Sequence, residues 1–244
     1  MHRFDLDLFN FVKIANQESW KTISISVGVK NEDKELIKKI KQSSLRVDFV
    51  TIDIAHGHSL AMREMISFIK DNLDCIIIAG NVASYYSILD LVDWGADCVK
   101  IGVGQGAPCS TKDKTGFTAP MFTCVKECSK FNSSDAFKKV PLIADGGIKC
   151  NGDIAKSIVA GATMAMAGSL FSKCTDSPAE NIELNGVIYK RYFGSASALN
   201  KGHNNHIEGF EKHLESNGMT YKQKMIEIET KIKSLLDKFL NTQI

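Results

Sequence analysis

The feature that most constrains the fold is the regular return of short, almost wholly apolar segments rich in β-branched residues. Segments of this kind are typical of parallel strands that are buried on both faces of a sheet. Stretches with helical spacing lie between them, as at 32–42, where Leu36, Ile37 and Ile40 share one side. This alternation predicts right-handed βαβ crossovers and therefore an α/β fold with a parallel sheet. The six segments are 22–29, 48–55, 75–82, 98–104, 141–147 and 162–170.

Polar residues and glycines follow most of these predicted strands. In a (β/α)8 TIM barrel the active site gathers at the carboxyl ends of the strands. We therefore predict a TIM barrel, and because only six of its strands are recognisable, an incomplete one that lacks its first one to two βα units. The polar strand ends are Asp53 and His56, Gly80 and Asn81, Gly102 and Gly104, Asp145 to Gly147, and Gly168 with Ser169.

The last part of the chain has a different pattern. The segment 181–195 contains two strand-like runs around Asn185 and Gly186, a dipeptide typical of a hairpin turn. The segment from Met219 to Leu240 has an apolar helical stripe with charges opposite, which indicates a packing helix. The stripe consists of Met225, Ile228, Ile232, Leu235 and Phe239. We predict a single partial barrel domain over 1–244, with a hairpin and short flap at 181–218 and a C-terminal helix at 219–244.

Charge and composition favour a protein that acts on small molecules. Thirty basic and 28 acidic residues leave a formal net charge of +2, without the one-sided field of nucleic-acid-binding proteins. No signal-like segment opens the chain and no apolar run is long enough to cross a bilayer, so we expect a soluble, cytoplasmic protein.

Cysteine and histidine spacing argues against structural metal sites. The seven cysteines lack paired C-x-x-C spacing, which indicates reduced thiols. Cys124 and Cys128 stand four residues apart in a predicted helix, and we interpret them as part of a shared buried face. His56 and His58 lack a third ligand, so a catalytic metal is disfavoured.

A glycine-rich loop, "KIGVGQGAPCSTKDKTG" at 100–116, carries a cysteine at its tip. Gly102 and Gly104 permit positive φ and close approach of the backbone to a ligand. Cys109 would be exposed on this loop, as a nucleophilic thiolate must be. A lone loop cysteine is more often inert than catalytic, so these residues alone leave both interpretations open.

The same loop resembles the catalytic-loop signature of the IMP dehydrogenase and GMP reductase family, I-G-x-G-x-G-x-x-C-x-T. Further matching segments follow in the family's order, and the resemblance reaches to about Gly209. It implies a TIM barrel that assembles as a homotetramer, with covalent chemistry at C2 of a purine nucleotide. The segments are "TIDIAHGHS", "IIAGNV", "GADCVKIGVG", "PLIADGGIKCNGDIAKSIVAGATMAMAGSLFSKCTDSPAE" and "YKRYFGSAS".

The segment after Ser197 separates the branches of the family. Dehydrogenases insert a long flap there, whereas about ten residues precede "IEGFEKH" in this chain, as in the reductase branch. The resemblance thus implies conversion of GMP and NADPH to IMP, ammonia and NADP, with GMP and IMP as ligands. Two alternatives stay open: IMP dehydrogenase activity, from IMP to XMP with NAD, and a truncated, non-catalytic remnant that binds purine nucleotide or full-length relatives.

Matching positions imply the roles of individual residues. Cys109 corresponds to the nucleophile, Thr111 to the threonine that helps to handle the departing ammonia, and Glu208 to the proton donor. Asp145 corresponds to the residue that holds the ribose hydroxyls. The remaining substrate-binding positions are Gly146, Gly147, Gly168, Ser169, Tyr192, Gly194 and Ser195.

Cofactor and cation positions follow from the same comparison. Asp53, Gly80 and Asn81 correspond to residues near the nicotinamide end of NADPH. Carbonyl groups of Gly102, Gly104 and Cys109 correspond to ligands of a monovalent cation such as K⁺.

The chain also departs from the family pattern. Gln105 replaces the usual proline of "G-P-G", and Pro108 restricts the residue before the cysteine. After Glu208 there is no clear copy of the family's "K-G" segment. Relatives carry about sixty further residues before the segment that matches 1–4, and these close the barrel, so we expect a longer gene product or a remnant.

Overall fold

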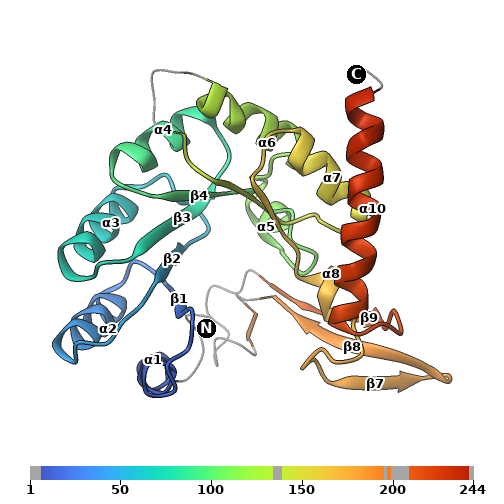
Figure 1. Ribbon diagram of the computed structural model, residues 1–244, viewed down its shortest axis with the longest axis horizontal. Helices are drawn as coiled ribbons and strands as arrows, with labels where there is room; N and C mark the ends of the chain where they lie inside the picture. Colours follow the sequence, from blue (N-terminus) through green and yellow to red (C-terminus); the bar gives the residue numbers. More distant parts are fainter. Residues whose placement is uncertain (1–6, 134–138, 195–196, 199–208, 242–244) are drawn as a thin grey trace. The chain divides into compact units, whose positions relative to one another are not determined.

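Parallel strands and helices alternate from residue 24 to residue 166, as the apolar periodicity predicts (Figure 1). The computed structural model describes residues 7–133, 139–194, 197–198 and 209–241. The described residues form two compact units, one from those within 1–101 and 127–142 and the other from those within 102–126 and 143–244. Each of the six predicted strands is present within its expected segment, so the α/β fold class is confirmed.

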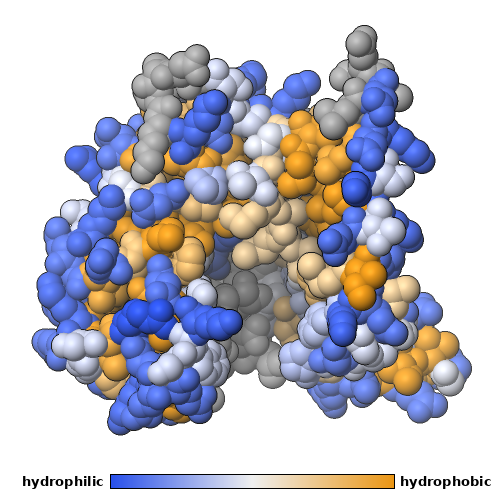
Figure 2. Space-filling view, viewed as in Figure 1, coloured by the Kyte–Doolittle hydropathy of each residue, from blue (hydrophilic) through white to orange (hydrophobic). Residues whose placement is uncertain are grey.

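The first unit contains four parallel strands that pair in chain order. They are β1 (Ser24–Val27), β2 (Phe49–Asp53), β3 (Ile76–Val82) and β4 (Cys98–Ile101). Helices α2 (Asn31–Gln42), α3 (Leu60–Asn72) and α4 (Tyr85–Asp93) connect them and lie along one face (Figure 1). Apolar side chains of both layers form the core, and the outer surfaces of α2 and α3 are largely hydrophilic (Figure 2).

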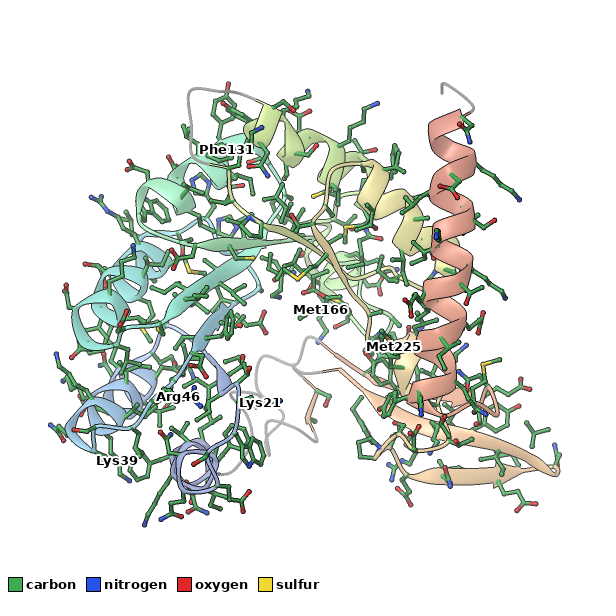
Figure 3. The ribbon with its side chains drawn as sticks, in the orientation of Figure 1. Lys21, Lys39, Arg46, Phe131, Met166 and Met225 are labelled. Carbon is green, nitrogen blue, oxygen red and sulfur yellow. The ribbon has the colours of Figure 1, made fainter. Side chains whose placement is uncertain are left out.

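A helix precedes the first strand, where sequence patterns predicted no element. This helix, α1 (Leu8–Gln17), begins after Asp7, whose side chain accepts a hydrogen bond from Asn10 N at 2.8 Å. The ammonium of Lys39 in α2 lies 4.0 Å from the centre of the Phe9 ring (Figure 3 labels Lys39). A buried stripe of Leu8, Val12 and Ala15 packs α1 onto the unit.

The chain crosses between the units in helix α6 (Met121–Ser129), which is followed by the 3-10 helix η1 (Lys130–Ser133). Cys124 and Cys128 of α6 are both buried, which confirms the interpretation of their spacing as apolar packing. Phe131 of η1, labelled in Figure 3, is 1% exposed and is one of the largest buried side chains of the first unit.

The second unit combines parallel and antiparallel strands. Strand β5 (Leu142–Asp145) pairs in parallel with β6 (Met164–Met166), and helix α7 (Asn151–Val159) joins them. Short helices follow two of its loops, α5 (Thr111–Thr115) and α8 (Ser169–Ser172). Strands β7 (Asn181–Leu184), β8 (Val187–Phe193) and β9 (Glu211–Glu215) form a separate antiparallel sheet.

The predicted hairpin turn is confirmed. Asn185 and Gly186 both have positive φ, 52° and 77°, and they connect β7 to β8 in a two-residue turn. Behind the hairpin, the ammonium of the buried Lys190 donates to the carbonyl oxygens of Thr175, Ser177 and Ala179 at 3.0, 3.2 and 3.5 Å. These three hydrogen bonds connect the segment before β7 to the middle of β8.

The predicted C-terminal helix is also present, as α10 (Tyr221–Asn241). Ile228 is 7% exposed and packs with Ile148 and Leu170, whereas Met225 of the predicted stripe is 52% exposed (Figure 3). The buried stripe is thus narrower than the sequence pattern suggests. Among the described residues, no helix combines the length and apolarity that a membrane span requires.

Lowering the pH should reduce the folding stability of this chain more than that of its Glu227→Gln variant. Hydrogen bonds from Lys231 and Lys224 lower the pKa of Glu227 from its ordinary 4.5 to about 2. Because the folded-state pKa lies below the unfolded one, the carboxylate stabilises the fold above pH 4.5, and this contribution is lost as the pH falls towards 2. Urea unfolding midpoints at about pH 5.5 and about pH 3 should therefore differ less for the variant. An equal difference would contradict the prediction; Glu229→Gln, exposed on the same helix, should keep the full difference.

Candidate active site

The cysteine loop of the second unit is held by its own backbone and by a neighbouring hydroxyl. Gly102 and Gly104 have φ of 131° and 77°, a region that glycine adopts readily. Cys109 N donates to Gly106 O at 3.0 Å, which closes a turn just before helix α5. The half-buried Cys109 thiol donates to Thr111 Oγ1 at 3.3 Å, so these two predicted catalytic residues are in contact.

Two later segments of the chain meet this loop. Cys109 forms an antiparallel bridge with Gly209, and Phe210 N donates to Pro108 O at 3.0 Å. Gly194 approaches Gly209 so closely that a Cβ on Gly194 would lie 2.9 Å from Gly209 Cα. The predicted residues Ser195 and Glu208 lie outside the described residues, but each is adjacent in sequence to one of these two glycines.

The loop after β5 packs on the cysteine loop through bare backbone. Gly146 and Gly147 both have positive φ, 102° and 76°. A Cβ on Gly146 would lie 3.0 Å from Gly106 N, and a Cβ on Gly102 would overlap the carbonyl oxygen of Asp145. Side chains at these glycines would push the two loops apart. Because these positions are glycine, the loop that carries Asp145 can lie against the cysteine loop.

Tyr192 connects the hairpin to the loop that precedes α8. Its hydroxyl lies where a Cβ on Gly168 would be, directly before Ser169 at the start of α8. Burial, together with the charge of Asp145, raises the pKa of Tyr192, so the phenol stays protonated at neutral pH. Asp145 and Gly168, which the resemblance implied as substrate-binding residues together with Tyr192, thus both lie near Tyr192 in the second unit.

Substituting Gly168 by alanine should destabilise the protein through Tyr192 alone. The backbone of Gly168 has φ of −88°, which alanine also adopts, so the cost comes from the overlap with the Tyr192 hydroxyl. We expect a loss of about 1–3 kcal/mol in the free energy of unfolding, as for other overpacked sites. The double variant Gly168→Ala/Tyr192→Phe lacks the clashing oxygen and should recover most of the loss in a denaturant titration. No recovery would show that the tyrosine hydroxyl is not the obstacle.

In the first unit, three predicted cofactor residues gather around a lysine that sequence patterns did not single out. Lys100 in β4 is 4% exposed, and its ammonium donates to Asp53 Oδ1 at 2.8 Å and to Asn81 Oδ1. Gly80 makes room for it, because a Cβ there would lie 2.6 Å from Lys100 O. A charged residue within the apolar run "CVKIGVG" was the signal that could have identified Lys100.

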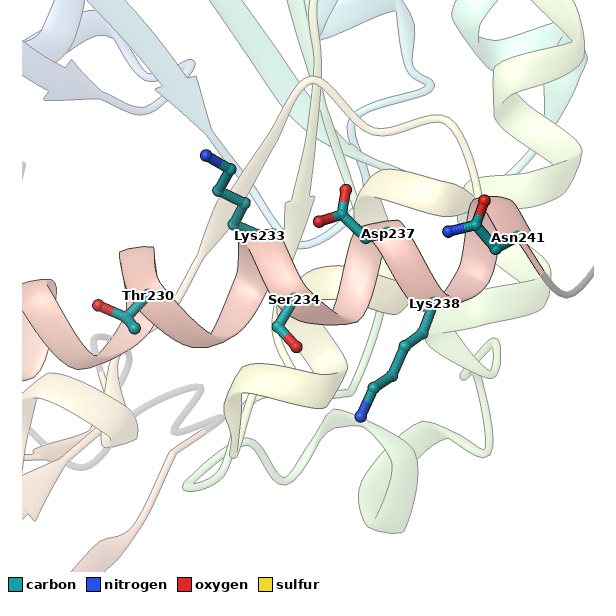
Figure 4. A pocket seen from close by; sticks show the side chains of 6 residues that line it. All are labelled: Thr230, Lys233, Ser234, Asp237, Lys238 and Asn241. Carbon is teal, nitrogen blue, oxygen red and sulfur yellow. The ribbon is translucent and has the colours of Figure 1, made fainter.

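The described residues show no cluster of three or more His, Cys, Asp or Glu side chains that could hold a metal ion. His58 instead pairs with Asp90, with Nε2 and Oδ2 2.6 Å apart, and stacks on Trp94. A hollow of about 380 Å³ runs along α10 (Figure 4), but the side chains that line it, Thr230, Lys233, Ser234, Asp237, Lys238 and Asn241, all come from that one helix. It is not the candidate site.

Two other cysteines are poor nucleophiles. Burial, with the charges of nearby aspartates, raises the pKa of Cys75 to about 11, and burial raises the pKa of Cys98 to about 11. Both thiols are therefore protonated at neutral pH, which makes them slow to react.

Comparison with known proteins identifies the family of this chain. The family model described as "IMP dehydrogenase / GMP reductase domain" matches residues 12–242. The chain belongs to this family. It is 43% identical over 239 residues to a GMP reductase of Mesoplasma florum and 44% identical over 242 residues to one of Bacillus subtilis. These alignments cover 95% and 96% of the chain and 72% and 71% of the relatives.

A solved relative has the same fold. The crystal structure of a variant GMP reductase from Trypanosoma brucei, in complex with guanosine 5'-monophosphate, matches with a TM-score of 0.77 and 29% identity. The match covers 87% of this chain but 45% of that one. It confirms the predicted fold class, an incomplete TIM barrel. The chain spans about 63% of a further GMP reductase, from Leptothrix cholodnii, to which it is 44% identical.

Proposed function

We propose that this chain carries out, as part of a GMP reductase, the NADPH-dependent reductive deamination of GMP to IMP and ammonia. The observation that carries the proposal is the contact between the Cys109 thiol and the Thr111 hydroxyl on a loop that packs against Asp145. The two relatives aligned above are GMP reductases, and a third GMP reductase of similar fold was solved with GMP bound.

Cys109 acts as the nucleophile in this proposal. Its sulfur adds to C2 of GMP, and the exocyclic amino group leaves as ammonia, so that the purine is held as a thioimidate. The Thr111 hydroxyl, in contact with the thiol, helps to pass protons to the departing ammonia. NADPH, when bound, supplies the hydride that replaces sulfur at C2, which releases IMP and the thiolate. Glu208, adjacent to the bridged Gly209, serves as the proton donor.

The other loops of the second unit bind the nucleotide. Asp145 holds the ribose, because its two carboxylate oxygens can accept hydrogen bonds from the two ribose hydroxyls. Backbone N–H groups near the positive-φ glycines bind the phosphate, as loops after the last strands of such barrels commonly do. The phosphate and base are assigned to Gly146, Gly147, Gly168, Ser169, Tyr192, Gly194 and Ser195.

The Lys100 cluster fits the nicotinamide carboxamide. Asp53 and Asn81 supply a carboxylate and a carboxamide at the ends of adjacent strands, and Lys100 fixes one oxygen of each. A primary amide has two donors and an acceptor, which matches this set of groups. Gly80 keeps the strand surface bare beside them.

We further propose that carbonyl oxygens of Gly102, Gly104 and Cys109 bind a monovalent cation such as K⁺. Carbonyl oxygens are suitable donors for hard cations, and the positive-φ glycines allow a loop to turn them towards one point. Assembly as a homotetramer in the cytoplasm remains part of the same proposal.

The test follows the near-ultraviolet absorbance of NADPH. Loss of absorbance that requires GMP, with release of ammonia, supports the reductase. Formation of NADH from IMP and NAD would establish the dehydrogenase instead. Binding of GMP without turnover in either direction would favour a non-catalytic remnant.

A further inference from the structure

Helix α10 packs beneath both glycine loops that are assigned to the phosphate. Ile148 follows Gly147, Leu170 follows Ser169, and the two meet Ile228 of α10 in one cluster. These three side chains are 4%, 5% and 7% exposed. Each loop is therefore anchored by an apolar side chain one residue beyond its predicted ligand, and α10 supplies the shared anchor.

A polar contact joins α10 to the same region. Asn151, the first residue of α7, donates through Nδ2 to Glu227 Oε1 at 3.0 Å. The ammonium groups of Lys224 and Lys231 lie 3.0 and 2.9 Å from the two oxygens of Glu227. Glu227 is thereby held in one position, and it fixes the point at which the loop from Asp145 enters α7.

Stability alone does not account for this contact. Asn151 is 8% exposed, and its Oδ1 has no hydrogen-bond partner in the part of the chain that the structure describes. A buried carbonyl oxygen without a partner is costly, and an apolar pair of similar shape would avoid that cost. Such polar contacts, when kept in spite of their cost, can fix a unique geometry.

We propose that Glu227, through Asn151, and Ile228 are positioning residues that hold the two glycine loops at the separation needed by a nucleotide phosphate. The inference rests on the proposed function, because it takes the Gly146–Gly147 and Gly168–Ser169 loops as the phosphate site. It adds that residues of the C-terminal helix, which touch no ligand themselves, set the affinity for the phosphate group.

Calorimetric titration of the chain with GMP and with guanosine separates phosphate binding from base and ribose binding. Glu227→Gln and Ile228→Ala should each weaken GMP binding about tenfold and leave guanosine binding within about twofold. Glu229→Gln and Ile226→Ala make the same chemical changes at exposed positions of α10 and should change neither. Equal loss for GMP and guanosine, or no loss, would overturn the inference.

A second variant guards against simple destabilisation. Asn151→Leu removes the orphaned oxygen, so its urea midpoint should equal or exceed that of the unaltered chain, while its affinity for GMP falls about tenfold. A variant that is as stable and binds GMP normally would contradict a positioning role.

The two proposals fail in different ways. If the unaltered chain binds GMP no more tightly than guanosine, the phosphate site is wrong and the proposed function falls together with the inference. If GMP is preferred and the α10 variants retain that preference, the proposed function stands and only the positioning role is refuted.

Discussion

Replacing Cys109 with alanine should lower GMP-dependent NADPH oxidation by roughly 10⁶-fold, the scale found when a covalent nucleophile is removed. The loss belongs to the chemical step, because in the proposed mechanism the thiol forms the bond to C2. The structure predicts that nucleotide binding survives, since Asp145 and the glycine loops are held by backbone packing that does not involve the sulfur. Steady-state rates and calorimetric GMP affinity measure the two effects separately.

The control is another half-buried cysteine. Cys75→Ala, in the first unit, should keep full activity. Treatment with iodoacetamide at neutral pH should inactivate the protein in step with modification of Cys109, whereas Cys75 and Cys98, whose pKa values are about 11, should react slowly. Cys150 is exposed and should be replaced by serine beforehand. Turnover that persists in a protein fully modified at Cys109 would refute the assignment of this residue as the nucleophile.

Replacing Lys100 with methionine should destabilise the chain by roughly 3–5 kcal/mol, the usual result of removing one partner of a buried ion pair. The Lys100 side chain is 5% exposed and that of Asp53 is 27% exposed, so the remaining carboxylate would lose its counter-ion in a largely enclosed place. Asn81 Oδ1 would lose a donor as well. Denaturant unfolding gives the size of the loss.

The double variant Lys100→Met/Asp53→Leu separates stability from function. Removing both charges should recover more than half of the lost stability, because no uncompensated charge remains. Its KM for NADPH should nevertheless stay raised by about tenfold or more, since the proposed carboxamide ligand is gone. If stability and KM recover together, the cluster is structural and the cofactor assignment is wrong.

The strands were predictable because each is a nearly continuous apolar run. When such a run is buried, its backbone N–H and C=O groups are buried with it, and strand pairing supplies their hydrogen bonds. The turn at Asn185 and Gly186 was predictable for a local reason, since both residues tolerate positive φ. Helix α1 was missed, although its buried residues Leu8, Val12 and Ala15 have helical spacing, because the pattern extends over only ten positions. In isolation, such a stretch gives a weak signal, and packing on α2 makes it a helix.

Contacts between residues far apart in sequence were beyond prediction from patterns. In the sequence, Asn151 and Glu227 each have the polar character of helix-surface residues, and only the packing of α10 on α7 brings them together. The same holds for the bridge between Cys109 and Gly209, which joins residues separated by a hundred positions. The resemblance predicts which residues form the site, whereas the structure shows which of the described ones are in contact.

The bridge between Cys109 and Gly209 has a kinetic implication. Since Phe210 N donates a hydrogen bond to Pro108 O, any outward movement of the chain at Phe210 must break hydrogen bonds to the loop that carries Cys109. Movement of the chain at Phe210, which would admit a purine, is therefore coupled to the position of the Cys109 sulfur. Amide hydrogen exchange at Phe210 should then slow when a bound purine nucleotide holds the thiol in place. The exchange rate of this one backbone amide would therefore report whether nucleotide is bound.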